Sequence, residues 1–148
     1  MGVLDMNCNS NTTPLINEIS GVSCNSGCAP KDINVICKTI VIPNGQEILA
    51  IQGENNAAVR YFLVPKINEN DVDMSDKTFT INIKTNSGSI ISKQIEEPEI
   101  LENYIKLKLE ITEDITKESG IISLQIVAIS DNFVWKSYSA NFKIASSL

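Results

Sequence analysis

Four cysteines are the residues in this sequence whose spacing comes nearest to a metal site. They are Cys8, Cys24, Cys28 and Cys37. Cys24 and Cys28 lie within the spacing of zinc ligands, and four thiolates could close a tetrahedral site. The other spacings fit no familiar zinc motif, and a disulfide would require an oxidising compartment. We therefore interpret the cysteines chiefly as unremarkable thiols, with metal binding and disulfide formation as the two alternatives.

An acidic segment from Asp71 to Asp76 begins like a calcium-binding loop. Such a loop needs Gly at its sixth position and Glu at its twelfth. Here those two positions hold Asp76 and Asn82. We therefore interpret the segment as a solvated connection between two strands, turned by its Asp and Ser side chains.

A second acidic run contains Glu96, Glu97, Glu99 and Glu102. Paired carboxylates perform glycoside hydrolysis when they flank the bond that is cleaved. The spacing identifies no partner carboxylate, and Pro98 interrupts the run. Because runs of charge are usually solvated, we predict a charged loop here.

The chain has no histidine. It therefore lacks the commonest general base, the histidine-activated nucleophiles and the commonest metal ligand. It also has no Gly-rich phosphate loop and no G-x-S-x-G nucleophile elbow. We predict that the protein is not an enzyme and that it needs no cofactor.

The aromatic residues suggest one binding alternative. Trp135 and Tyr138, with Tyr61 and Tyr104, could form a platform on which sugar rings stack. Aromatic residues make up only 5% of the chain, however, and large aromatic side chains commonly anchor cores. We therefore predict that Trp135 lies in the core, and a carbohydrate-binding module stays as an alternative of a different class.

The charge balance argues against nucleic acid as a partner. The net charge is −6, and Arg60 is the only arginine. Recognition of phosphates and bases relies on basic faces and on bidentate arginine contacts. No apolar run approaches the ~20 residues of a membrane span. The first residues lack a basic segment followed by an apolar one, so we predict no signal peptide and no membrane partner.

The elements that must position these residues are strands. Residues 1–32 are polar and carry three of the four cysteines, so we predict an extended, flexible arm. From residue 33 to 148, β-branched runs and period-2 alternation end at turn signals, as at 78–84 and 104–111. About eight short strands without a long amphipathic helix indicate an all-β sandwich.

Three local patterns make more detailed predictions. The run 35–42 is rich in β-branched residues, and we predict one continuous strand with Cys37 as a small core residue inside it. The link 85–88 has the composition of a hairpin loop. Residues 112–117 predict a short helical turn, because a Thr cap precedes two acidic residues.

The stretch from residue 60 to 144 resembles the N-terminal module of phage baseplate upper proteins, found in Gram-positive phages and prophages. Five segments carry the resemblance in the family's order: Arg60–Lys66, Asp71–Thr78, Ile81–Gly88, Ser119–Ile126 and Phe133–Ser137. They are similar, in turn, to an apolar strand ending in Pro and a basic residue, a Val-Asp-Leu-Ser turn, a strand with its hairpin, a Gly-containing strand, and a Trp-containing step before the last strand.

The resemblance implies an immunoglobulin-like antiparallel β-sandwich that serves as an attachment module in a virion and has no enzyme activity. The positions that match the family's motifs are structural: Pro65, Asp73, Ser75, Gly88, Gly120 and Trp135. Family members continue into stems, coiled coils or receptor-binding heads, whereas this sequence ends at Leu148. The cysteine-bearing arm is also not a feature of the family. We therefore expect a free-standing virion component.

These observations predict a non-enzymatic structural protein of the phage tail baseplate, located in the virion after assembly in the bacterial cytoplasm. We expect its partners to be other virion proteins, in a homo-oligomeric or multi-copy assembly that uses the arm and exposed strand edges. Capsid decoration or head-fibre attachment is the alternative within this class. Binding of a cell-surface glycan is the alternative from another class.

Overall fold

The computed structural model describes residues 32–148, and this part of the chain is all-β apart from one helical turn. The predicted arm up to residue 31, with Cys8, Cys24 and Cys28, lies outside the described residues. The strands are β1 (Ile33–Ile36), β2 (Thr39–Val41), β3 (Ile48–Ile51), β4 (Ala58–Pro65), β5 (Thr78–Lys84), β6 (Ile90–Gln94), β7 (Glu99–Ile100), β8 (Tyr104–Ile111), β9 (Gly120–Ser130), β10 (Phe133–Lys136) and β11 (Ala140–Ala145). The helical turn is α1 (Glu113–Thr116).

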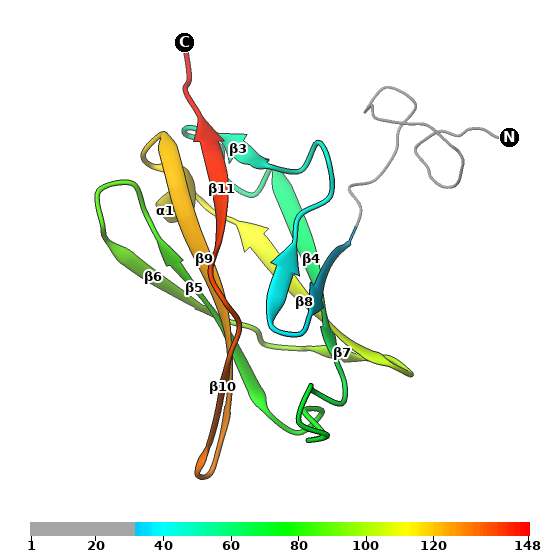
Figure 1. The fold of residues 1–148 in the computed structure, drawn as a ribbon. Helices are drawn as coiled ribbons and strands as arrows, with labels where there is room; N and C mark the ends of the chain where they lie inside the picture. Colours follow the sequence, from blue (N-terminus) through cyan, green and yellow to red (C-terminus); the bar gives the residue numbers. More distant parts are fainter. Residues whose placement is uncertain (1–31) are drawn as a thin grey trace, which may run out of the picture. The chain divides into compact units, whose positions relative to one another are not determined.

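The strands form two mixed sheets that pack against each other (Figure 1). The five-stranded sheet has the order β2-β1-β4-β8-β7. The six-stranded sheet has the order β3-β11-β9-β5-β6, and β10 also pairs with β9. Each sheet contains one parallel pair, β1 with β4 and β3 with β11, among antiparallel neighbours. The predicted all-β class is confirmed, and the layered packing is that of a β-sandwich.

Both sheets turn one face toward a shared core, because side chains alternate between the two faces of a strand. In β8, buried Ile and Leu residues alternate with outward Lys and Glu residues. Phe62 of the five-stranded sheet meets Phe142 of the six-stranded sheet edge to face, with ring centres 6.5 Å apart. The alternation predicted at 104–111 and 78–84 is confirmed by β8 and β5, and the predicted helical turn is confirmed by α1.

The prediction of one continuous strand over 35–42 is wrong. The run folds back at Cys37 and Lys38 into a hairpin, in which Val35 pairs with Ile40. Both turn residues have positive φ, 48° and 70°, as a two-residue hairpin turn requires. Cys37 is therefore exposed at a turn, which corrects its prediction as a small core residue. The sequence did not indicate this turn, because two-residue hairpin turns with positive φ usually contain Asn or Gly. With this split and the two-residue β7, residues 32–148 contain eleven strands, more than the predicted number of about eight.

The sandwich has two ends, which we name by their connections. The hairpin end holds the β1–β2 turn, the β4–β5 loop and the β7–β8 turn. The helix end holds α1, the β3–β4 loop and the β5–β6 turn (Figure 1). Loops at the ends of a sandwich are the usual places for binding sites, so the two ends are the first places to look for function.

Candidate interaction site

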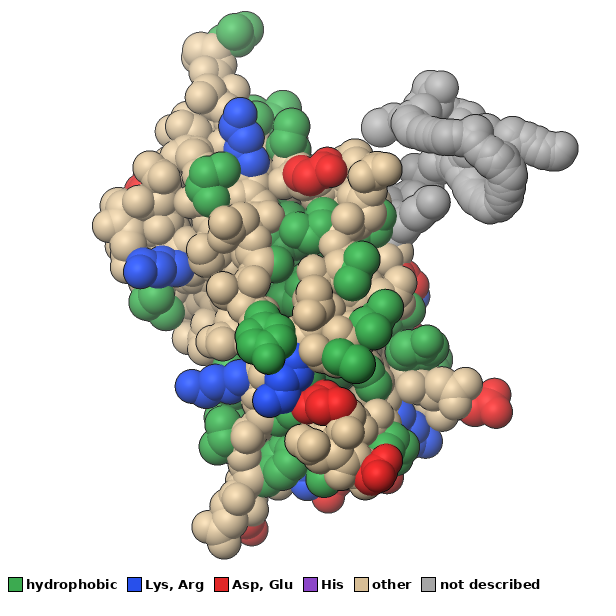
Figure 2. Space-filling model, viewed as in Figure 1, with side chains coloured by type: hydrophobic (Ala, Val, Ile, Leu, Met, Phe, Trp, Pro, Cys, Tyr) green, Lys and Arg blue, Asp and Glu red, His purple; other side chains and the backbone are tan. Residues whose placement is uncertain are grey.

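A hollow of about 340 Å³ opens at the hairpin end of the five-stranded sheet. Its walls come from the end of β1, the end of β4 with the loop that follows, and the turn into β8. The lining residues are Val35, Ile36, Cys37, Pro65, Ile67, Asn68, Glu69, Asn103 and Tyr104. Figure 2 shows hydrophobic side chains gathered over this part of the surface, with a few acidic and basic side chains between them.

The lining of the hollow is mainly apolar, and several of its apolar side chains are exposed. Ile36 is 59% exposed, and Ile67 and Tyr104 are exposed as well. Covering apolar surface gains about 25 cal/mol per Å² removed from water. A contiguous exposed apolar patch typically marks a contact with another molecule. The hollow is therefore suited to binding another molecule through apolar contacts.

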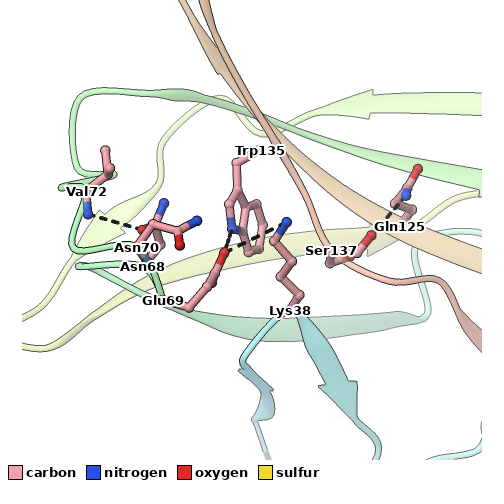
Figure 3. Close-up of polar contacts among 8 residues, drawn as sticks. All are labelled: Lys38, Asn68, Glu69, Asn70, Val72, Gln125, Trp135 and Ser137. Atoms are coloured by element: carbon pink, nitrogen blue, oxygen red, sulfur yellow. Dashed lines mark hydrogen bonds and ion pairs between the residues drawn. The ribbon is translucent and has the colours of Figure 1, made fainter.

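Glu69 fixes one wall of the hollow by joining the two sheets (Figure 3). Its Oε2 accepts a hydrogen bond from the Trp135 Nε1–H at 2.9 Å, and the Lys38 Nζ lies 3.9 Å from the same oxygen. The Lys38 carbonyl in turn accepts a hydrogen bond from the Tyr138 N–H at 2.8 Å. The β1–β2 turn is thus tied to the six-stranded sheet by both a side chain and the backbone.

Trp135 lies behind this wall and is only 4% exposed. A sugar platform needs an accessible aromatic face, and the face of Trp135 is covered. Tyr138 and Tyr104 are exposed, but they lie on different segments of the fold. The carbohydrate-binding alternative therefore loses its central residue.

Short polar side chains hold the loop that follows β4. Asn68 is buried, and its Oδ1 accepts hydrogen bonds from the backbone N–H groups of Asn70 at 2.8 Å and Val72 at 3.1 Å. Asp71 then takes a positive φ of 63°. Because an Asn side chain can replace a missing backbone partner in a turn, the loop keeps its shape from within the chain.

Asp73 starts the turn that leads into β5. Its Oδ1 accepts hydrogen bonds from the Ser75 hydroxyl at 2.7 Å and from the Ser75 N–H at 2.8 Å. These two bonds lower the pKa of the Asp73 carboxyl below its usual value. The carboxylate is thus engaged in a local turn, the role that the sequence interpretation gave to this acidic segment.

The helix end is closed by polar contacts between its loops. The buried Thr116 hydroxyl donates to the Glu54 carbonyl at 2.6 Å, and the Gly53 N–H donates to the Thr116 carbonyl at 3.1 Å. The Arg60 Nη2 donates to the Leu49 carbonyl at 3.0 Å. Burial lowers the pKa of the Arg60 guanidinium, although the Glu54 carboxylate opposes this effect.

The positions that match the family motifs are distributed over both ends of the sandwich. Pro65 lines the hollow, and Trp135 lies behind it. Gly88 and Gly120 lie at the helix end, in the β5–β6 turn and at the start of β9. Gly120 has a φ of 122°, and a Cβ there would come within 2.6 Å of the Asn86 Cγ. Only a glycine avoids both the strained backbone and this close approach.

The glutamate run 96–102 surrounds β7 at the rim of the five-stranded sheet. Glu99 lies opposite Lys106 in the ladder between β7 and β8. The glutamates at 96, 97 and 102 are exposed. The run is therefore a charged margin of the sheet.

Residues 32–148 contain no group of three or more His, Cys, Asp or Glu side chains arranged to hold a metal ion. In the same part of the chain, no helix is long and apolar enough to cross a membrane. The chemical groups of the hollow are apolar side chains, the amides of Asn68 and Asn103, the exposed Cys37 thiol and the paired Glu69 carboxylate.

Sequence reasoning missed the residues that build the hollow, above all Glu69 and Ile36. Glu69 and Trp135 are 66 positions apart in the sequence, so no local sequence pattern predicts the hydrogen bond between them. Ile36 was interpreted as part of a continuous strand, and its exposure follows from the hairpin at Cys37 and Lys38. The sequence shows that residues 60–67 are mainly apolar, but this composition does not tell which of them lie in the core and which line the hollow.

No protein-family model matches the chain. No curated protein matches its sequence either.

Proposed function

We propose that this domain is a non-enzymatic attachment module of a phage virion, placed in the tail baseplate. The observation that carries the proposal is the ordered set of segments that resembles the N-terminal module of baseplate upper proteins. Their distinctive residues hold structural positions in this fold. Pro65 ends β4, Asp73 and Ser75 form the turn before β5, and Gly120 begins β9. Such a resemblance supports a shared fold, from which function follows only by analogy.

An immunoglobulin-like arrangement is part of this proposal, and the strand order supports it. In an immunoglobulin variable domain, one sheet contains the order B-E-D and the other contains G-F-C-C′. Matched in chain order, β4-β8-β7 corresponds to the first series and β11-β9-β5-β6 to the second. The departures are the parallel pairing of β1 with β4 and the position of Trp135, which lies on β10.

Protein contact is the activity that the hairpin end supports best. An apolar centre with a polar rim is typical of protein–protein interfaces. Here the polar side chains of Glu69 and Asn103 line the hollow together with the apolar side chains of Ile36 and Tyr104. Partners would therefore be other virion proteins, in the baseplate or, as the alternative, in a capsid or head-fibre attachment.

Mass spectrometry of purified particles tests the proposal. We expect particles from the bacterial strain that encodes the chain to contain it at a fixed stoichiometry to the tail proteins. Immunogold labelling should then place it at the tail tip. Labelling over the head would replace the baseplate position by capsid decoration. Absence of the chain from purified particles would contradict both placements.

A further inference from the structure

The connection between β2 and β3 carries the only Asn-Gly pair of the sequence, Asn44 and Gly45. The Gln46 N–H donates to the Pro43 carbonyl at 3.0 Å and closes a turn around this pair. Gly45 takes a φ of 88°, and Asn44 keeps an ordinary negative φ. This combination fits a type II turn, in which the third position favours glycine. The turn lies where the chain passes from the five-stranded sheet to the six-stranded sheet.

The surroundings of this pair are open. Asn44 and Gly45 are both exposed, and neither belongs to a strand or a helix. A Cβ added to Gly45 would meet no atom within 4 Å outside its chain neighbours. Because glycine has no side chain of its own, no side chain shields the Gly45 nitrogen from the Asn44 amide. The pair is therefore accessible to the reaction in which a backbone nitrogen attacks the side chain that precedes it.

That reaction converts an asparagine into aspartate and isoaspartate. The Gly45 nitrogen forms a bond to the Asn44 Cγ, and its proton passes to solvent. The bond between Cγ and Nδ2 breaks, and Nδ2 takes up a proton and leaves as ammonia. Water then opens the five-membered imide: cleavage of the new bond gives aspartate, and cleavage of the original peptide bond gives isoaspartate. Each event consumes one water, releases one ammonia and leaves a carboxylate in place of an amide.

A carboxylate holds the nitrogen that would attack. The Gly45 N–H donates to the Glu47 Oε1 at 2.9 Å. The nitrogen attacks after it has lost this proton, and it is then negatively charged. A carboxylate beside it disfavours this form, because like charges repel each other. We therefore expect Glu47 to slow the reaction, and because the contact is exposed to water the effect should be only several-fold.

The β5–β6 turn provides an internal comparison, because Asn86 is followed there by Ser87. The Asn86 Cγ packs against Gly120, where an added Cβ would lie only 2.6 Å from it. The Ser87 N–H donates to the Glu118 Oε1 at 3.0 Å, and the Ser87 hydroxyl donates to the Glu118 Oε2 at 2.7 Å. Distant segments thus hold both the carbon and the nitrogen that would have to meet. The same reaction at Asn86 should therefore be slow.

We propose that Asn44 is a site of spontaneous deamidation, and that Glu47 slows this modification by opposing the loss of the Gly45 proton. The isoaspartate product has one more methylene group in its main chain than the original asparagine. The extra length lies next to the start of β3, where the Lys143 N–H donates to the Glu47 carbonyl at 2.8 Å. The reaction therefore makes a population of chains heterogeneous in charge, and in the length of this turn, as the chains age.

Peptide mapping by mass spectrometry of the full chain, incubated in neutral buffer at physiological temperature, tests the site. Electron-transfer fragmentation distinguishes aspartate from isoaspartate at each asparagine. Asn44 should convert at least tenfold faster than Asn86 and give both products. Asn44→Gln should remove the reaction at this position, because its longer side chain closes the corresponding ring much more slowly. In urea the rate at Asn86 should rise more than the rate at Asn44, because the packing of Asn86 against Gly120 is lost.

Glu47→Gln tests the role of the carboxylate. The variant keeps the length of the side chain and removes its charge, so Asn44 should convert several-fold faster. Glu97→Gln is the matched control, because Glu97 is an exposed glutamate of another segment, and it should leave the rate unchanged. Circular dichroism checks that both variants are folded. A folded chain in which Asn44 converts no faster than Asn86 would overturn the site. A Glu47→Gln variant that reacts no faster than the wild-type chain would overturn the role of Glu47.

Discussion

The two ends of the sandwich use their polar groups in opposite ways. At the helix end, the Thr116 hydroxyl and the Glu54 carbonyl join two loops directly. At the hairpin end, Glu69 joins Lys38 and Trp135 across a wall, while apolar side chains in front of it stay exposed. Both ends hold the sheets together, and both carry exposed apolar side chains, among them Ile51, Ile90 and Ile121 at the helix end. The difference is that the apolar side chains of the hairpin end line a hollow, whereas loops of the helix end are joined by direct polar contacts.

The largest expected loss of stability comes from a substitution behind the hollow at the hairpin end. Trp135→Ala removes a buried aromatic side chain and should lower the free energy of unfolding by about 3–5 kcal/mol, measured by urea denaturation. Trp135→Phe keeps an aromatic ring in the core but is smaller and lacks the N–H that binds Glu69, so it should cost less, about 1–3 kcal/mol. Equal losses for the two variants would show that the hydrogen bond, and not the packing, holds this wall.

The next effect concerns the helix end. Thr116→Val keeps the shape of a fully buried side chain but removes the hydroxyl that binds the Glu54 carbonyl. Leaving the carbonyl of the half-buried Glu54 without this donor should cost about 1–2 kcal/mol of unfolding free energy. Thr78→Val, at an exposed strand position, serves as the control and should be nearly neutral. A neutral Thr116→Val would remove the main support for describing this end as closed.

A smaller effect is expected for the charge beside the hollow. Lys38→Met removes the ion pair with Glu69, whose atoms are 3.9 Å apart at a partly exposed site. Such pairs contribute about 0–1 kcal/mol and are screened by salt. The loss in thermal unfolding experiments should therefore be below that of Thr116→Val and should shrink as salt is added. A loss that does not depend on salt would mean that Lys38 acts through packing.

The smallest effect is a dependence on pH at the helix end. Burial raises the pKa of the Asp114 carboxyl, but hydrogen bonds from Lys93 and Thr112 outweigh it, so the pKa is lowered from 3.8 in the folded chain. This carboxylate therefore stabilises the fold at pH values above the unfolded-state pKa, and the stabilisation is lost as the pH falls through the folded-state value. The urea midpoint of the wild-type chain should fall below about pH 4, and that of Asp114→Asn should fall less.

Glu97→Gln provides the control for this titration, because Glu97 is an exposed glutamate of the β7 margin. Its acid unfolding should follow that of the wild-type chain. If Asp114→Asn also follows the wild-type chain at every pH, the contact between Asp114 and Lys93 contributes nothing to the pH dependence.

Local patterns were enough to predict much of the fold. Alternation in 104–111 and 78–84 reports directly which side chains face a core, so β8 and β5 were predicted with their observed bounds. The helical turn at Glu113–Thr116 was predicted from a Thr followed by two acidic residues. In the structure Thr112 makes no capping hydrogen bond to the backbone, and its hydroxyl binds the Asp114 side chain instead.

The hollow could not be predicted in the same way, because distant segments build it. Its shape depends on the parallel pairing of β1 with β4 and on the bond between Glu69 and Trp135. Neither leaves a periodic signal in the sequence. The turn at Cys37 and Lys38 adds a second difficulty, since two non-glycine residues take positive φ there and propensity alone argues against it. Tertiary contacts, such as the bond from Tyr138 to Lys38, help to hold that turn.

The direction of β11 has a practical consequence for handling the domain. The strand ends at the helix end, where the Gln52 N–H donates to the Ala145 carbonyl and Ala145 pairs with Ile51. A tether fused after this strand therefore leaves on the side away from the hollow (Figure 1). On a sensor surface or a bead, immobilisation through that tether would orient every molecule alike, with its hollow toward the solution. Candidate partners could then be captured without blocking the surface that is meant to bind them.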